Sequence, residues 1–267
     1  MDQANTRSAN ERQSEFRAAV SKVPAVTFGF WVVKVAATTL GETGGDWVTM
    51  SLDLGYLVGS AIFMAIFILL VAGQIRAKRF HPVLYWATIV GTTTLGTTIA
   101  DFADRTIGLG YPGGVAIVAT LLAASLATWH RSQGTLSVES VTTPKVEWFY
   151  WVTILLSQTL GTALGDWSAD DDLGGLGLGF ETAAVIFGGG LAIVAALYFW
   201  TRISRTALFW LAFVLTRPLG ATLGDLLDKP VSQGGLHLSR LYASVVLVVL
   251  MAFCVRVFPQ RPAGRGA

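Results

Sequence analysis

The chain has 267 residues, of which 53% are hydrophobic and 13% are charged, and its formal net charge is +2. A soluble globular domain carries about 25% charged residues, so most of this chain must face something other than water. The single cysteine, Cys254, lies in an apolar run and excludes a disulfide framework. Residues 1–22 lack the apolar core of a signal peptide and are predicted to form a polar cytoplasmic tail. Residues 259–267 are predicted to form a disordered basic tail.

Eight apolar runs follow the first tail, each near the roughly 20 residues that a helix needs to cross a bilayer core. They cover residues 24–46, 54–75, 83–101, 112–129, 147–166, 180–200, 207–225 and 238–258. The odd-numbered runs share a motif in which Trp stands 15 residues before Asp, with Leu-Gly at fixed offsets between them. The copies occupy residues 31–46, 86–101, 151–166 and 210–225. One transmembrane domain, residues 23–258, is therefore predicted to hold two-helix repeats at about 23–75, 83–129, 147–200 and 207–258.

Two helices per repeat mean that every repeat enters the membrane in the same direction. The predicted fold class is all-α: a polytopic membrane protein with eight transmembrane helices, arranged as four parallel repeats with pseudo-symmetry about the membrane normal. Tails and loops on one side hold 14 of the 19 Lys and Arg residues, and the opposite loops hold only Arg105, Lys229 and Arg240. By the positive-inside rule, both termini are cytoplasmic and the motif Asp residues face outward. The motif Trp residues either anchor the helices at the inner headgroup level or serve only in packing.

An oxygen-rich stripe is predicted along the motif helices, because residues three, four and seven positions before each Asp share its face on a helical wheel. The stripe consists of Asp46, Asp101, Asp166 and Asp225 with Glu42, Thr39, Thr43, Thr94, Thr97, Thr98, Thr159 and Thr162. Carboxylates in a membrane are costly unless paired or hydrated, which makes them functional candidates. Such hard oxygen ligands suit Mg²⁺, Mn²⁺, Ca²⁺, alkali ions or protons. The predicted metal ligands are Asp46, Asp101, Asp166, Asp225 and Glu42. The alternatives are helix ends at the water interface and Thr hydroxyls bonded to their own helix.

Two further features of the motif helices have structural and functional interpretations. Gly or Ala stands one and five positions before each motif Asp, and this small-xxx-small spacing predicts close helix packing. Lys34 and Arg217 lie near the middle of the first and last motif helices. A cation at that depth needs a carboxylate or a water-filled cavity, and the expected partners are Glu42 and the motif Asp residues. The pairs are either fixed structural contacts or a charge relay, in which ion binding at the acids competes with Lys34 or Arg217.

Four tandem two-helix units, each with a Trp and a helix end of the type TxLGxxxGD, resemble a family of bacterial integral membrane proteins built from a tandem repeat of unknown function. The resemblance covers residues 23–258 and implies an inner-membrane location without a defined activity. Repeat four departs from the pattern, because Arg217 and Pro218 replace the polar pair of the other copies.

The function expected from these features is transport of a small hard cation such as Mn²⁺ or Mg²⁺, with proton-coupled export as one version. A channel-like pore and a membrane scaffold without transport activity are the alternatives. The chain lacks H-E-x-x-H, a phosphate-binding loop and G-x-S-x-G, so neither an enzyme nor a cofactor is expected. The expected partners are the cation and the lipid bilayer, without nucleic acid. Homo-oligomerisation stays open.

Overall fold

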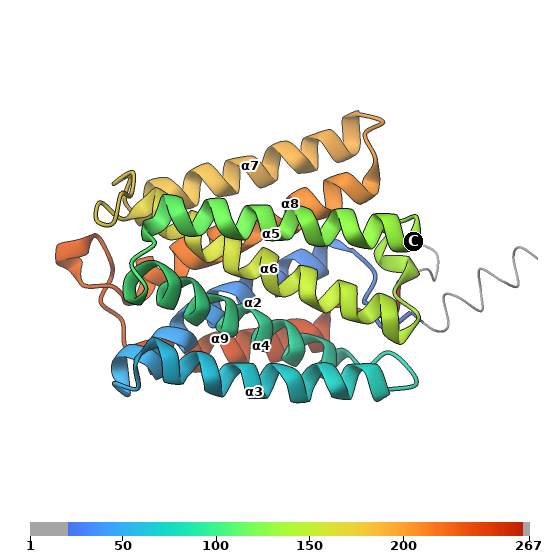
Figure 1. Cartoon of the computed structure of the whole chain (residues 1–267), viewed down its shortest axis with the longest axis horizontal. Helices are drawn as coiled ribbons and strands as arrows, with labels where there is room; N and C mark the ends of the chain where they lie inside the picture. Colours follow the sequence, from blue (N-terminus) through green and yellow to red (C-terminus); the bar gives the residue numbers. More distant parts are fainter. Residues whose placement is uncertain (1–20, 264–267) are drawn as a thin grey trace, which may run out of the picture.

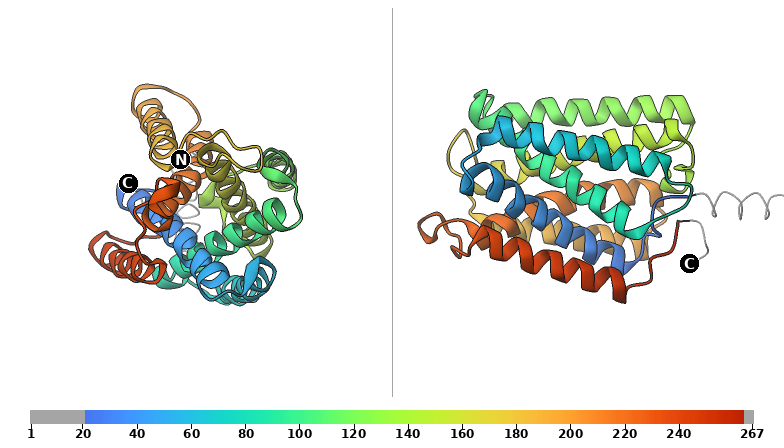
Figure 2. Two further views of the ribbon diagram at one scale, coloured as in Figure 1. Left: turned by 90° about the vertical axis from the view of Figure 1, so that its left-hand side faces the viewer. Right: turned by 90° about the horizontal axis from the view of Figure 1, so that it is seen from below.

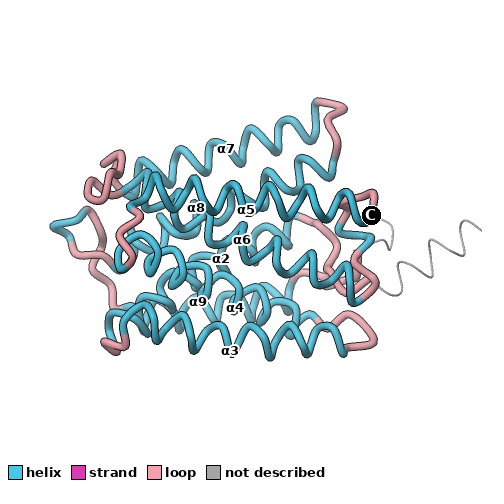
Figure 3. Tube along the Cα trace, viewed as in Figure 1, coloured by secondary structure: helices cyan, strands magenta, loops and turns pink. Residues whose placement is uncertain are grey.

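The computed structural model describes residues 21–263, so the predicted tail up to residue 20 and the last four residues lie outside the described part. Within it, the long elements are all α-helices, and the only strand-like pairing is a single bridge between Pro24 and Pro262. The helices form one bundle (Figure 1), and the loops gather at its two ends (Figure 3). The predicted all-α fold is therefore confirmed for the described residues.

Long helices alternate along the chain between motif helices and plain helices. The motif helices are α2 (Phe28–Asp46), α4 (Pro82–Asp101), α6 (Pro144–Ala169) and α8 (Arg205–Asp228). The plain helices are α3 (Gly55–Arg76), α5 (Gly110–Gln133), α7 (Phe180–Trp200) and α9 (Arg240–Val257). Short helical turns are η1 (Trp47–Ser51), η2 (Phe102–Thr106), η3 (Val138–Ser140) and η4 (Val231–Gln233). All four motif helices run toward the same end of the bundle, as parallel repeats require.

Local sequence signals set the starts of the motif helices. The hydroxyl groups of Thr27, Thr143 and Ser204 each accept a hydrogen bond from the backbone amide three residues later, which satisfies one free donor at the helix start. Pro82 and Pro144 occupy the first turns of α4 and α6, where a missing amide hydrogen costs nothing.

The four motif helices form a closed ring. Helix α2 contacts α4, α4 contacts α6, α6 contacts α8, and α8 returns to α2. Each plain helix packs on the motif helix of the following repeat: α3 on α4, α5 on α6, α7 on α8, and α9 back on α2. The end-on view in Figure 2 places the plain helices at the periphery. Because every repeat covers its neighbour, the core is complete only when all four repeats are present.

The outside of the bundle is apolar. On α9, for example, Tyr242, Val246 and Phe253 are each more than 60% exposed. Five helices, α3, α5, α7, α8 and α9, are long and apolar enough to cross a membrane. The other three, α2, α4 and α6, carry polar side chains toward the ring, which lowers their mean hydropathy. An apolar exterior around a polar centre is the arrangement expected of a helical membrane protein.

Close contacts between motif helices depend on the predicted small residues. Glycines five positions before each motif Asp all face the next helix of the ring: Gly41, Gly96, Gly161 and Gly220. A Cβ atom added at any of them would approach that helix to less than 3.0 Å. Small residues allow helix backbones to approach each other in this way. The predicted packing face is therefore confirmed.

An aromatic layer closes the ring at the end that holds the described chain termini, here called the basic end. It consists of Phe30, Trp31, Tyr85, Trp86, Tyr150, Trp151, Phe209 and Trp210. Ring centroids of successive repeats lie 5.4 Å apart for Phe30 and Trp86, and 5.7 Å apart for Tyr85 and Trp151. The hydroxyl groups of Tyr85 and Tyr150 are hydrogen-bonded at 2.6 Å. Trp86, Trp151 and Trp210 are buried, and the half-buried Trp31 packs against the same core, which favours the packing interpretation over a headgroup anchor.

Two terminal segments cover the aromatic layer at the basic end. The backbone amide of Ala25 donates to the carbonyl of Arg261 at 2.7 Å, and that of Ala263 donates to Val23 at 2.7 Å. Nearby, the Lys22 ammonium forms an ion pair of 2.7 Å with the buried Glu147. The described part of the predicted basic tail, residues 259–263, is therefore packed against the ring.

Replacing Gly96 by Ala tests the ring packing. Its Cβ would lie 2.9 Å from the backbone nitrogen of Thr159, which cannot rotate away. We expect Gly96→Ala to lower the free energy of unfolding in detergent by about 1–3 kcal/mol. The matched control is Gly188→Ala on α7, where a Cβ meets nothing within 4 Å. Equal effects of the two substitutions on the unfolding midpoint would contradict the close packing.

Candidate functional site

Every fourth residue of the motif helices faces the axis of the ring. Residues 4, 8 and 12 positions before each motif Asp are at most 2% exposed in all four helices, with Ala221 and Phe213 among them. Residues spaced four apart form a row that is inclined to the axis of their own helix. The motif helices are themselves tilted relative to the ring axis, so this row runs parallel to the ring axis. The result is a stack of layers, each with one residue from every repeat.

The layers change from apolar to acidic along the axis. Next to the aromatic layer, the lysine layer contains Lys34, Ile89, Ile154 and Phe213. The arginine layer contains Thr38, Thr93, Gln158 and Arg217. The glutamate layer contains Glu42, Thr97, Thr162 and Ala221. The aspartate layer contains Asp46, Asp101, Asp166 and Asp225, all at most 4% exposed. It lies at the other end of the bundle, here called the acidic end.

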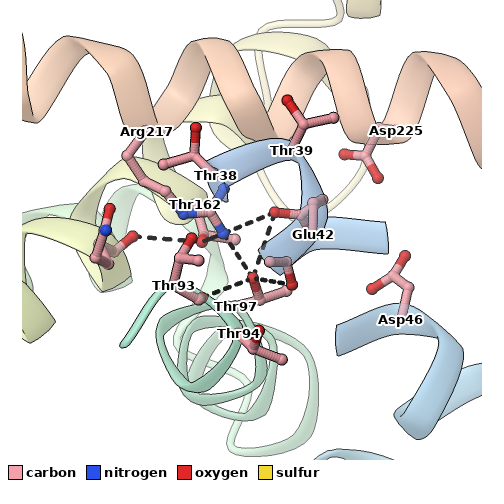
Figure 4. Close-up of polar contacts among 12 residues, drawn as sticks. Thr38, Thr39, Glu42, Asp46, Thr93, Thr94, Thr97, Thr162, Arg217 and Asp225 are labelled. Carbon is pink, nitrogen blue, oxygen red and sulfur yellow. Dashed lines mark hydrogen bonds and ion pairs between the residues drawn. The ribbon is translucent and has the colours of Figure 1, made fainter. Parts of the chain in front are cut away.

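Arg217 connects all four motif helices at the centre of the ring (Figure 4). From α8, its Nη2 atom lies 2.8 Å from Glu42 Oε2 on α2. The same nitrogen donates hydrogen bonds of 2.5 Å to the hydroxyl groups of Thr97 on α4 and Thr162 on α6. The side chain is fully buried, and its Nε and Nη1 atoms have no hydrogen-bond partner among residues 21–263. The expected pairing of Arg217 with Glu42 is therefore confirmed.

Lys34 differs from Arg217, because no carboxylate of the described residues lies within ion-pair distance of it. Its ammonium lies 3.3 Å from Thr216 Oγ1 and 3.5 Å from Gln158 Oε1. It also lies 4.0 Å above the centre of the Phe213 ring. The expectation of an acidic partner for Lys34 is wrong, because Glu42 lies eight residues further along the same helix, a rise of about 12 Å.

Lys229 neutralises one side of the aspartate layer. This residue follows the last residue of α8, and its ammonium lies 3.1 Å from Asp46 Oδ2 and 3.2 Å from Asp225 Oδ1. Burial lowers the pKa of Lys229, but the carboxylates of Asp225 and Asp46 outweigh it and raise the pKa well above its ordinary value. The ammonium is therefore charged and bridges α2 and α8.

Arg105 neutralises the opposite side of the aspartate layer. Its guanidinium lies 3.0 Å from Asp101 and 3.0 Å from Asp170 in the following repeat. Asp166 has no ion pair within residues 21–263, although it is buried. Arg105 and Lys229 both stand four residues after a motif Asp, in repeats two and four. The corresponding residues in repeats one and three are Met50 and Asp170.

Three of the five predicted metal ligands come together. One carboxylate oxygen each from Glu42, Asp46 and Asp225 lie within 4.8 Å of one another, and all three residues are buried. We call these three residues the carboxylate cluster. Asp101 is paired with Arg105 instead, and Asp166 stands apart from the cluster among the described residues. Carboxylate oxygens at this spacing can hold a hard divalent cation.

The predicted threonines occupy three different environments. Thr97 and Thr162 line the centre, as described above. Thr39, Thr94 and Thr159 donate to the carbonyl groups four residues earlier on their own helices, at 2.9–3.0 Å.

Thr43 and Thr98 face the plain helices instead of the axis. The Thr43 hydroxyl is hydrogen-bonded to Ser244 on α9 at 2.9 Å, and the methyl group of Thr98 lies beside Gly59 on α3. The helical wheel grouped them with the Asp because it assumes a helix parallel to the ring axis. The oblique helices turn these positions outward.

Sequence reasoning missed several residues of the site. In the arginine layer these are Thr38, Thr93 and Gln158, and at the acidic end they are Arg105 and Lys229 as partners of the motif Asp residues. A signal was present in both cases. The repeat alignment places the first three in register with Arg217, and the two cations stand at the i,i+4 spacing that brings side chains together on a helix.

Together, these features define an all-helical protein with a closed ring of four repeats, an apolar exterior and an ionisable centre. The family model described as Repeat of Unknown Function (DUF347) matches residues 29–80, 84–135, 149–204 and 208–261. The chain belongs to this family, and its four copies correspond to the four two-helix repeats. Neither the curated proteins nor the solved structures gave a match.

A double-mutant cycle tests the central ion pair. We expect Arg217→Met to lower the free energy of unfolding by about 3–5 kcal/mol, because it leaves Glu42 buried without a cation. Adding Glu42→Gln should restore at least half of that loss, because no uncompensated charge remains. Chemical denaturation of the purified protein measures both effects. Simply additive losses would show that the two residues do not interact.

Proposed function

We propose that this protein transports a small hard cation, such as Mn²⁺ or Mg²⁺, across the bacterial inner membrane. In this proposal all eight long helices span the bilayer, both termini are cytoplasmic and the aspartate layer lies at the outer side. The apolar exterior supports the membrane location. The concentration of Lys and Arg in the tails and in the loops of the basic end supports the orientation.

The carboxylate cluster is the observation that carries this proposal. Three acidic side chains from α2 and α8 are buried inside the ring, with oxygens within 4.8 Å of one another. Desolvating three carboxylates together costs several kcal/mol for each charge. A scaffold held together by glycine packing has no need of such groups. A protein that binds a cation needs them.

The polar groups next to the cluster extend it inward. Thr97 and Thr162 belong to the same layer as Glu42: the Thr97 hydroxyl lies 3.4 Å from Glu42, and both hydroxyls contact Arg217. Hydroxyl and carboxylate ligands favour hard ions. A cation bound at Glu42 competes with Arg217 for the same carboxylate. In the version with proton-coupled export, Arg217 and Lys34 form the charge relay that links the acidic end to the deeper layers.

The aromatic layer favours a carrier over a channel-like pore. Aromatic rings packed against one another across the basic end cover the polar layers on that side. A continuously open pore needs a hydrated path at both ends, whereas a carrier is closed at one end in each of its states. Single-channel conductance in a planar bilayer would support the pore instead.

Flux measurements test the proposal directly. We expect Glu42→Gln, Asp46→Asn and Asp225→Asn each to reduce Mn²⁺ uptake into proteoliposomes by at least about tenfold, because each removes one hard ligand from the bound ion. The matched control is Asp172→Asn, which removes an exposed carboxylate from the acidic-end loops and should leave the flux unchanged.

Folding of each variant is checked by its elution volume and unfolding midpoint in detergent. Normal flux in all three well-folded cluster variants would exclude this site. The absence of flux in the wild type with Mn²⁺, Mg²⁺ and Ca²⁺ would instead favour the scaffold.

A further inference from the structure

Lys229 occupies the position that a substrate cation would take. Its ammonium lies 3.1 Å from Asp46 on α2 and 3.2 Å from Asp225 on α8, so it contacts two of the three cluster carboxylates. Asp225 Oδ1 is buried and accepts no hydrogen bond of good geometry from the described residues, despite its nearness to Lys229. The ammonium therefore offsets the charge of the cluster without satisfying all of its oxygens.

The two cations of this region differ in their freedom to leave. Arg217 is fully buried and bonded to three other helices, so it cannot withdraw without opening the ring. The side chain of Lys229 is 12% exposed and extends from the segment that follows α8. A lysine ammonium is a compact charge on a flexible stem. Rotation of that stem can release Asp46 and Asp225 while the backbone stays in place.

The formal charges of the cluster suit such a displacement. The three carboxylates face Arg217 and Lys229. Arg240 also lies 3.9 Å from Asp46, but it is balanced by its closer partner Asp228 at 3.2 Å, so one negative charge remains on the cluster. If Lys229 leaves and a divalent ion enters, the three negative charges are balanced by the ion and Arg217. If a divalent ion entered beside Lys229, one positive charge would be in excess inside the bundle, which is costly.

We propose that Lys229 is a tethered counter-ion, which occupies the carboxylate cluster without substrate and is displaced when a divalent cation binds. This inference rests on the proposed function and specifies its substrate as divalent. A tethered group competes at a high effective concentration, so it lowers the apparent affinity for the ion and suppresses binding of weaker competitors. Lys229 is thus a specificity-determining residue at the acidic end.

Titration calorimetry of the purified full chain with Mn²⁺ tests this role. We expect Lys229→Met to tighten Mn²⁺ binding by about tenfold, because the ion no longer competes with a charge pair. The matched control is Lys145→Met, which removes an exposed lysine charge near the start of α6, at the basic end and away from the cluster. Its Mn²⁺ affinity should stay within about twofold of the wild type.

A second readout keeps the test independent of the stability of the variants. In the wild type, Mn²⁺ should increase the rate at which an amine-reactive reagent modifies Lys229, measured by peptide mass spectrometry, because the ammonium moves into solvent. Mn²⁺ binding with equal affinity in the wild type and Lys229→Met, or an unchanged rate of modification, would overturn the counter-ion role alone. Absence of Mn²⁺ binding in both proteins would overturn the proposed function together with it.

Discussion

The ion pair between Arg217 and Glu42 places a positive and a negative charge inside the bundle, where the two side chains are 0% and 3% exposed. Its geometry requires four helices, because the same guanidinium nitrogen also reaches Thr97 and Thr162. Those contacts require close helix backbones, and Gly161 provides the space for the stem of Arg217. The glycines, the polar layers and the closure of the ring are therefore parts of one arrangement, in which buried charges are tolerated only because every repeat contributes to them.

The backbones of the four repeats are arranged with fourfold symmetry, but the side chains that they place on the axis differ. The layers keep one residue per repeat, yet the lysine, arginine and glutamate layers each hold a single charged residue. The carboxylate cluster consequently forms between repeats one and four, where Glu42 meets Asp225, and not at the other three junctions. A duplicated scaffold with one specialised junction suits a protein that binds one ion at a time. The aromatic layer and the terminal segments close the basic end behind that junction.

The repeats, the helix count and the glycine packing face could be predicted because they depend on spacing that is identical in four copies. The pairing of Arg217 with Glu42 was also predictable, since a buried cation needs an acid. Thr43 and Thr98 were misplaced because a helical wheel contains no information on how far a helix tilts. How the helices and loops meet in three dimensions decides the partners of Lys34, Lys229 and Arg105. The same contacts decide that Asp101 and Asp166 lie apart from the cluster.

The proposed function depends on the binding of a cation by Glu42, Asp46 and Asp225. The most direct measurement is an anomalous difference map at the manganese edge from crystals grown with Mn²⁺. We expect one peak between α2 and α8, with oxygens of these three carboxylates at about 2.0–2.6 Å. A ring without a peak, with manganese only on exposed carboxylates such as Asp171 and Asp172, would contradict it.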